Sequence, residues 1–166
     1  MPKVFTSKTQ KLGKLAEDAV AQYLVSKGFT IVEQNYTRKS GEIDIIALEN
    51  QPVKQGSNVS HETDQVLHFV EVKSVSRVTF EGGVEPRLGE FRPEDNMHPK
   101  KVKRLKTTME TYLMSFRNEE NGHKRHTSVY KGHVENGVRF QFDLIVVYVN
   151  TVSREMIIKP LWNIIL

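Results

Sequence analysis

Two short apolar segments of the chain each contain an acidic residue at a position where a strand interior is expected. Asp44 lies inside Ile43–Ala47, and Glu71 lies inside Phe69–Lys73, two residues before Lys73. A buried carboxylate is unfavourable unless it is paired with a cation or binds a metal ion. Because side chains alternate along a strand, Glu71 and Lys73 share one face, about 7 Å apart along the strand. This pattern indicates a polar site built on strands.

The two acidic residues could share a divalent cation if their strands are neighbours. Two close carboxylates repel each other unless a cation or a proton lies between them. Mg²⁺, with Mn²⁺ as a substitute, suits carboxylate and carbonyl oxygens, so the expected ligands are Asp44, Glu71 and the backbone carbonyl of Val72. Such an ion polarises a phosphoryl oxygen and lowers the pKa of a bound water. Lys73 would then orient or help to deprotonate that water, or stabilise the charge that develops on the phosphate.

The same spacing also has a simpler interpretation. Glu71 and Lys73 could form an ion pair on a half-exposed strand, with Asp44 paired to an arginine elsewhere in the chain. An acidic residue two positions before a lysine is common in strands, so the residues alone leave both interpretations open. Motifs for a serine or cysteine nucleophile and a glycine-rich phosphate loop are missing from the sequence.

Charge is distributed unevenly along the chain. The segment from Glu42 to Glu71 holds six acidic residues and one basic residue, whereas the segment from Met97 to His133 holds nine basic and three acidic residues. A basic segment beside an acidic centre favours a polyanionic partner such as nucleic acid. The alternative is a charged, solvated helix face, which is the commoner meaning of such a run. The candidate phosphate contacts are Lys100, Lys101, Lys103, Arg104 and Lys106.

Hydrophobic periodicity predicts a single α/β domain over residues 1–166. A stripe of apolar residues at three-four spacing predicts a first helix over Lys8–Lys27 and a second helix that begins at Pro99. Three strands in succession between the helices favour a central mixed β-sheet flanked by α-helices. Alternating apolar residues predict strands over Phe29–Asn35, Glu42–Glu49, Val66–Val75, Phe140–Tyr148 and Met156–Lys159. Polar loop inserts are expected near 50–65, 77–98 and 117–137.

The same patterns predict which side chains face the core. The first helix should pack Leu12, Leu15, Val20 and Leu24 against the sheet. One face of the second strand should carry Ile43, Ile45 and Ala47, with Asp44 on the other face.

Composition points to an ordinary globular protein. Of the 166 residues, 38% are hydrophobic and 27% are charged, which is enough apolar surface for a stable core. Cysteine is absent, which excludes disulfide scaffolds, thiol catalysis and cysteine-based zinc sites. The longest strongly apolar run, Leu144–Val149, is far shorter than the roughly 20 residues that span a bilayer. We therefore expect a soluble, cytoplasmic protein with no membrane partner.

Asp44 followed by Glu71-x-Lys73 resembles the split catalytic motif of the PD-(D/E)xK nuclease superfamily, whose members have a restriction-endonuclease-like core. More closely, the chain resembles the YraN family of small bacterial proteins with that core. Archaeal Holliday-junction resolvases look similar more distantly, over a helix-one glutamate, the strand aspartate and the Glu-x-Lys. The segments that match the YraN family, in its order, are Gly13–Asp18, Gly28–Phe29, Asn35–Tyr36, Gly41–Ala47, Phe69–Lys73, Pro99–Lys101, Tyr112–Leu113 and Arg139–Asp143.

The resemblance implies roles for four polar residues. Asp44 and Glu71 would be metal ligands, Lys73 would be the catalytic lysine, and Glu17 would match the helix-one glutamate that completes nuclease sites of this kind. Without the resemblance, Glu17 would be interpreted as a surface glutamate paired with a lysine. Departures from the family pattern are an extra residue pair before the aspartate of Arg139–Asp143 and longer loop inserts.

The function that the resemblance implies is a Mg²⁺-dependent nuclease. It would cleave phosphodiester bonds in DNA, with branched or otherwise structured DNA as the expected substrate. The alternative is a non-catalytic protein that binds nucleic acid or a partner on the same endonuclease-like core. The sequence leaves open whether the chain forms a homodimer.

Overall fold

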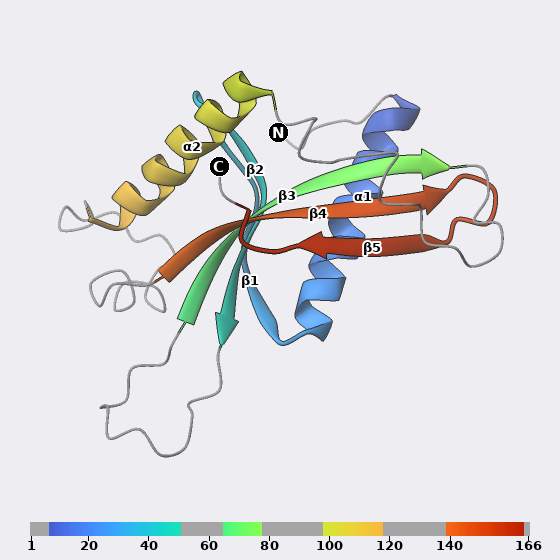
Figure 1. Ribbon diagram of the computed structural model, residues 1–166, viewed down its shortest axis with the longest axis horizontal. Coiled ribbons are helices and arrows are strands. Elements are labelled where there is room, and N and C mark those ends of the chain that lie inside the picture. The colour runs from blue at the N-terminus through green and yellow to red at the C-terminus, as the bar shows by residue number, and fades with distance from the viewer. Residues whose placement is uncertain (1–6, 51–64, 78–97, 118–138, 165–166) are drawn as a thin grey trace, which may run out of the picture.

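The computed structural model describes residues 7–50, 65–77, 98–117 and 139–164. Within these ranges the chain forms two helices and five strands (Figure 1). The helices are α1 (Lys8–Ser26) and α2 (Pro99–Arg117). The strands are β1 (Phe29–Arg38), β2 (Gly41–Asn50), β3 (Gln65–Arg77), β4 (Arg139–Asn150) and β5 (Met156–Leu161). Apart from their end residues, the predicted inserts near 50–65, 77–98 and 117–137 lie outside the described ranges.

The five strands form one mixed sheet in the order β1-β2-β3-β4-β5. Neighbouring strands are antiparallel except for β3 and β4, which are parallel. Parallel neighbours need a crossover connection, and α2 lies on the connection between these two strands. The predicted fold class is confirmed: the chain has an α/β fold with a mixed sheet and two flanking helices, consistent with a restriction-endonuclease-like core.

The two helices cover opposite faces of the sheet. Side chains of α1 pack against Ile45 and Ala47, whereas side chains of α2 pack against Ile46 and Leu48. Because successive strand residues point to opposite faces, this alternation assigns one face to each helix. In the part of the chain that the structure describes, neither helix has an apolar stretch long enough to cross a bilayer.

Helix α1 begins at a capping box. The Gln10 amide donates to the Ser7 hydroxyl at 3.1 Å, and the Ser7 amide donates to the Gln10 side chain at 3.2 Å. This reciprocal arrangement satisfies two amides that have no partner within the helix. The helix is followed by Gly28, whose φ of 90° suits a residue without a Cβ. The buried residues of α1 are Ala16, Val20, Ala21 and Leu24.

Leu15 does not join this buried set, contrary to expectation, and is 41% exposed. Ala16, Val20 and Leu24 lie four residues apart and form one line along the helix. Leu15 precedes that line by one residue, which is about 100° of helical rotation. Its side chain therefore lies beside the packed stripe rather than beneath it.

The expected grouping of Ile43 with Ile45 is also wrong. Ile43 packs in the cluster of Tyr36 on the α2 side, whereas Ile45 packs on the α1 side. Between the cross-strand pairs Gln34–Ile45 and Tyr36–Ile43 lies Asn35, which has a left-handed φ of 55°. The pairs on either side of Asn35 stay in register, and the register shift between β1 and β2 lies farther along, between Ile31 and Glu33. Strict alternation nevertheless does not hold at Ile43.

The core on the α2 side is rich in aromatic side chains. Tyr112 contacts Tyr36 and Phe69 edge to face, with ring centroids 4.9 and 5.6 Å apart. Leu105 and Met109 of α2 are buried in the same cluster. These contacts fix the position of α2 on the sheet, and the polar site depends on that position.

Candidate metal and phosphate site

The ladder between β2 and β3 ends next to Asp44. Its cross-strand pairs run from Asn50–Gln65 to Ile45–Val70, and β3 then continues its pairing with β4 as far as Arg77. Just beyond the last pair, the Val72 amide donates to Asp44 Oδ2 at 2.7 Å. The Asp44 side chain therefore continues the connection between the two strands after their backbone ladder ends.

Asp44 is partly buried beside other acidic groups. Burial, and then the negative charge of Glu71, raises the pKa of Asp44 to about 7, and Glu17 acts in the same direction. The hydrogen bond from the Val72 amide and the positive charge of Lys101 lower this pKa without cancelling the rise. Near neutral pH, Asp44 is therefore a group that a proton or a metal cation would stabilise.

The Glu71 side chain is 5% exposed and contacts two lysines. Lys73 Nζ lies 3.1 Å from Glu71 Oε1, which places the two strand residues on one face as their spacing predicts. Lys101 reaches the same oxygen from α2 and forms a second ion pair. Partial burial lowers the pKa of Lys73, but hydrogen bonding and the nearby carboxylates of Glu71 and Asp44 raise it above its ordinary value.

Glu17 and Val72 lie at the margin of this acidic pair. Glu17 projects from α1, with Oε2 4.0 Å from Lys14 Nζ, and its charge contributes to the raised pKa of Asp44. Val72 contributes its amide hydrogen to Asp44, and this bond orients the carboxylate. Among the described residues, no three histidine, aspartate or glutamate side chains are grouped closely enough to hold a metal ion.

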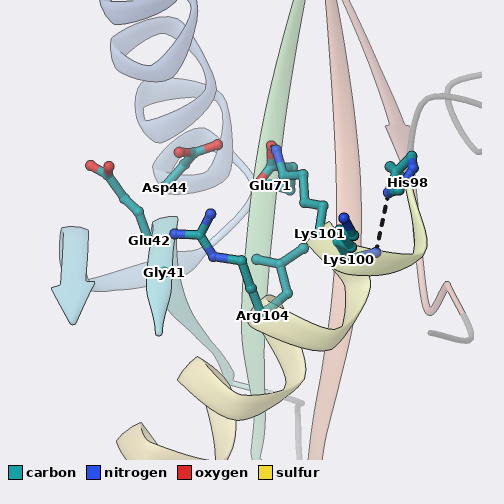
Figure 2. A pocket seen from close by; sticks show the side chains of 9 residues that line it. Gly41, Glu42, Asp44, Glu71, His98, Lys100, Lys101 and Arg104 are labelled. Carbon is teal, nitrogen blue, oxygen red and sulfur yellow. Dashed lines mark hydrogen bonds and ion pairs between the residues drawn. The ribbon is translucent and has the colours of Figure 1, made fainter. Parts of the chain in front are cut away.

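A pocket of about 510 Å³ lies between the acidic pair and α2. Figure 2 shows Lys101 and Arg104 extending from α2 toward the side of the pocket that carries Asp44 and Glu71. Acidic and basic groups thus meet across one opening. The residues that line it are Gly41, Glu42, Asp44, Glu71, His98, Lys100, Lys101, Arg104 and Leu105.

The five predicted phosphate contacts divide into two groups. Lys100, Lys101 and Arg104 line the pocket, whereas Lys103 and Lys106 are exposed elsewhere on α2. The first turn of α2 contains no acidic residue, and its lysines Lys100 and Lys101 line the opening.

Helix α2 is anchored to the turn between β1 and β2. Arg104 Nε donates to the Ser40 carbonyl at 2.9 Å, and the hydroxyls of Ser40 and Thr108 lie 2.8 Å apart. A Cβ atom at Gly41 would lie 3.1 Å from Thr108 Oγ1, so the helix approaches the turn closely. Sequence reasoning missed this anchor because its members lie 64 to 68 residues apart in the chain.

Comparison with known proteins identifies the family. The model of "Uncharacterised protein family UPF0102" matches residues 16–147, which include Glu17, Asp44, Glu71 and Lys73. The chain belongs to this family. A UPF0102 protein of Campylobacter lari is 31% identical over 74% of this chain and 87% of its own length. A UPF0102 protein of Campylobacter concisus is 33% identical over 66% of this chain and 73% of its own length. A UPF0102 protein of Helicobacter hepaticus is 36% identical over 62% of this chain and 69% of its own length.

Proposed function

We propose that this UPF0102 protein is a divalent-metal-dependent nuclease that cleaves phosphodiester bonds in DNA. The observation that carries the proposal is the Asp44–Glu71 pair. Glu71 is buried and Asp44 is partly buried, the two carboxylates repel each other, and both line a pocket with basic side chains of α2. Phosphodiester hydrolysis needs both features, because a cation at the acids activates the reaction and the basic groups hold the polyanion. The resemblance of Asp44 and Glu71-x-Lys73 to the PD-(D/E)xK motif supports the same activity.

The donor set fits a hard divalent ion. Asp44 and Glu71 offer carboxylate oxygens, the ligand type that Mg²⁺ and Mn²⁺ prefer, and we propose the Val72 carbonyl as a third ligand. The raised pKa of Asp44 supports a cation at this position. Repulsion from Glu71 contributes to the rise, and a bound cation would relieve that repulsion. Glu17, from α1, would complete the acidic set. A bound Mg²⁺ would polarise the scissile phosphate and lower the pKa of the attacking water.

Lys73 is proposed to act on the phosphate. Its ammonium lies 3.1 Å from Glu71 Oε1, so the buried acid fixes its position. Water attacks phosphorus and gives up a proton to solvent, the bond between phosphorus and the leaving oxygen breaks, and the leaving oxygen takes up a proton from solvent. Negative charge develops on the phosphoryl oxygens in the transition state. A fixed ammonium beside those oxygens stabilises this charge more in the transition state than in the substrate.

The basic side of the pocket is proposed to hold the DNA backbone. Lys100, Lys101 and Arg104 present cationic groups near the positive end of α2. Phosphate contacts carry no base information, so these residues would bind without regard to sequence. The substrate would then be selected by DNA shape, and branched or structured DNA is the class to test first.

A non-catalytic nucleic-acid-binding role is the second candidate, and one observation favours it. Lys101 already neutralises Glu71, and the described residues include no group of three acidic or histidine ligands. A protein in which lysines permanently replace the metal would keep the basic surface and bind DNA without cutting it.

Single-turnover cleavage separates the two functions. Duplex, flap and four-way-junction DNA are incubated with excess protein in Mg²⁺ and in Mn²⁺. The matched variants are Asp44→Asn and Lys73→Met. The controls on α1 are Asp18→Asn, whose side chain is half-exposed and pairs with Lys14, and Lys11→Met, which is exposed. The nuclease proposal expects cleavage by the wild type and both controls, and its loss in the two site variants. If no DNA is cut, or if all variants cut equally, the binding role is the better account.

A further inference from the structure

We propose that Lys101 is an internal competitor of the metal ion. In the metal-free protein it neutralises Glu71, and it transfers to a substrate phosphate when a divalent ion binds. This inference rests on the proposed function, because it concerns regulation of the same acidic pair. It makes metal binding and nucleic-acid binding cooperative.

The first support is the unequal environment of the two partners. Glu71 is 5% exposed, so its charge needs compensation, whereas the side chain of Lys101 is 37% exposed and borders the open pocket. Lys73 also pairs with Glu71, and its own side chain is 29% exposed. One carboxylate oxygen thus contacts two ammonium groups, which repel each other. Of the two, Lys101 is the more exposed and comes from a different element, so it is the one more easily displaced.

The second support is that Lys101 can leave without any movement of its helix. Its backbone amide donates to the His98 carbonyl at 2.7 Å, and α2 is held farther along by the Ser40–Thr108 and Ser40–Arg104 hydrogen bonds. The lysine side chain has four flexible carbons between this fixed backbone and its ammonium. Rotation of that side chain alone would carry the charge from Glu71 into the pocket.

The third support is what surrounds the displaced ammonium. Lys100 and Arg104 line the same pocket, so a released Lys101 would add to an existing cationic group (Figure 2). A divalent ion at Glu71 would repel Lys101 toward this group, where a phosphate would stabilise it. Since coupling between two ligands is reciprocal, phosphate binding would also favour metal binding.

The test compares Lys101→Met with Lys100→Met. Both variants remove one positive charge from the same pocket, but only Lys101 contacts Glu71. Mn²⁺ affinity is measured by calorimetry without DNA. We expect Lys101→Met to bind Mn²⁺ roughly tenfold more tightly than the wild type, which is the scale of removing one ion pair, and Lys100→Met to change it by less than about twofold. A Lys101→Gln variant and thermal melting establish that the effect is not misfolding.

The second measurement is the affinity for a short flap DNA by anisotropy, with and without saturating Mn²⁺. All three proteins carry Lys73→Met for this measurement, because that change is expected to slow cleavage on the order of 10²-fold or more, and a gel verifies that the probe stays intact. Mn²⁺ should strengthen DNA binding several-fold in the wild type and in Lys100→Met, but not in Lys101→Met. The inference would be overturned if Lys101→Met and the wild type bound Mn²⁺ with equal affinity. If Asp44→Asn lost Mn²⁺ binding in the same experiment, the proposed function would remain supported. If no variant binds Mn²⁺, both are contradicted.

Discussion

The Val72 amide donates to Asp44 Oδ2 at 2.7 Å, at the position where the backbone ladder between β2 and β3 ends. This one bond orients the carboxylate that the proposed metal site needs. It also explains why Asp44 remains close to Glu71, one residue before Val72, although the strands no longer pair there. The site therefore lies where the backbone pairing of β2 and β3 ends, and the Asp44 side chain connects the two strands there.

The raised pKa of Asp44 predicts how stability depends on pH in the presence of a chelator. The native state holds a proton on Asp44 up to about pH 7, whereas the unfolded chain releases it near the ordinary value of 3.8. The free energy of unfolding should therefore fall as pH rises from about 4 to 7 and then level off, by at most about 4 kcal/mol from this residue. Urea titrations of the wild type and Asp44→Asn should diverge over that window. Parallel pH profiles would contradict the raised pKa.

Replacing Lys73 should separate chemistry from binding. With Lys73→Met, the single-turnover cleavage rate should fall on the order of 10²-fold or more, because charge on the phosphoryl oxygens loses its fixed cation. Mn²⁺ affinity should not weaken, since an ammonium competes with the ion rather than holding it. Lys11→Met, on an exposed part of α1, is the control and should cut at the wild-type rate. Loss of Mn²⁺ binding together with cleavage would show that Lys73 has a structural role.

Sequence patterns alone predicted the pair of acidic residues, Asp44 and Glu71, but not the contact of Lys101 with Glu71. Alternation is a local property, so Glu71 and Lys73 could be placed on one face from their spacing. The contact between Lys101 and Glu71 spans 30 residues and depends on how α2 docks on the turn at Ser40. No local pattern encodes that docking, and Lys101 was therefore expected to contact phosphate alone.

The prediction of faces was also limited on β2. Alternation does not hold at Ile43, which packs on the α2 side, and the apolar pattern reveals neither the positive φ of Asn35 nor the register shift between Ile31 and Glu33 on β1. The lengths of strands were underestimated for a related reason. β1 extends to Arg38, beyond the predicted end at Asn35, because pairing with β2 continues through polar residues that carry no hydrophobic signal.

The salt dependence of DNA binding should distinguish the two groups of basic residues on α2. Removing one lysine–phosphate interaction should reduce the slope of log affinity against log salt by about one unit. We expect that reduction for Lys100→Gln, which lines the pocket, and a smaller one for Lys106→Gln, which is exposed elsewhere on the helix. Fluorescence anisotropy between low and moderate salt measures both slopes. Unchanged affinity and slope in a triple Lys100, Lys103 and Arg104 glutamine variant would mean that the helix is only a solvated face.

The anchor of α2 should contribute measurably to stability. Thr108 is fully buried and its hydroxyl bonds with Ser40, so Thr108→Val leaves that serine hydroxyl without this partner. The expected loss is about 1–2 kcal/mol in the free energy of unfolding. The control is Thr107→Val, one residue earlier, whose hydroxyl is exposed and bonds within the helix; it should cost less than about 0.5 kcal/mol. If urea denaturation gave equal losses in the free energy of unfolding for Thr108→Val and Thr107→Val, the hydrogen bond between Ser40 and Thr108 would not contribute to stability.

The central claim is that Asp44 and Glu71 together hold a divalent ion, and proton-linked calorimetry tests it most directly. Mn²⁺ is titrated into the wild type, Asp44→Asn and the control Asp18→Asn at pH 6 and pH 8. Because the ion must displace a proton from Asp44 below pH 7, the wild type and the control should bind several-fold more weakly at pH 6 and release protons there. Asp44→Asn should bind far more weakly at both pH values. Binding that is unchanged by Asp44→Asn, or no binding by the wild type at pH 8, would contradict the account.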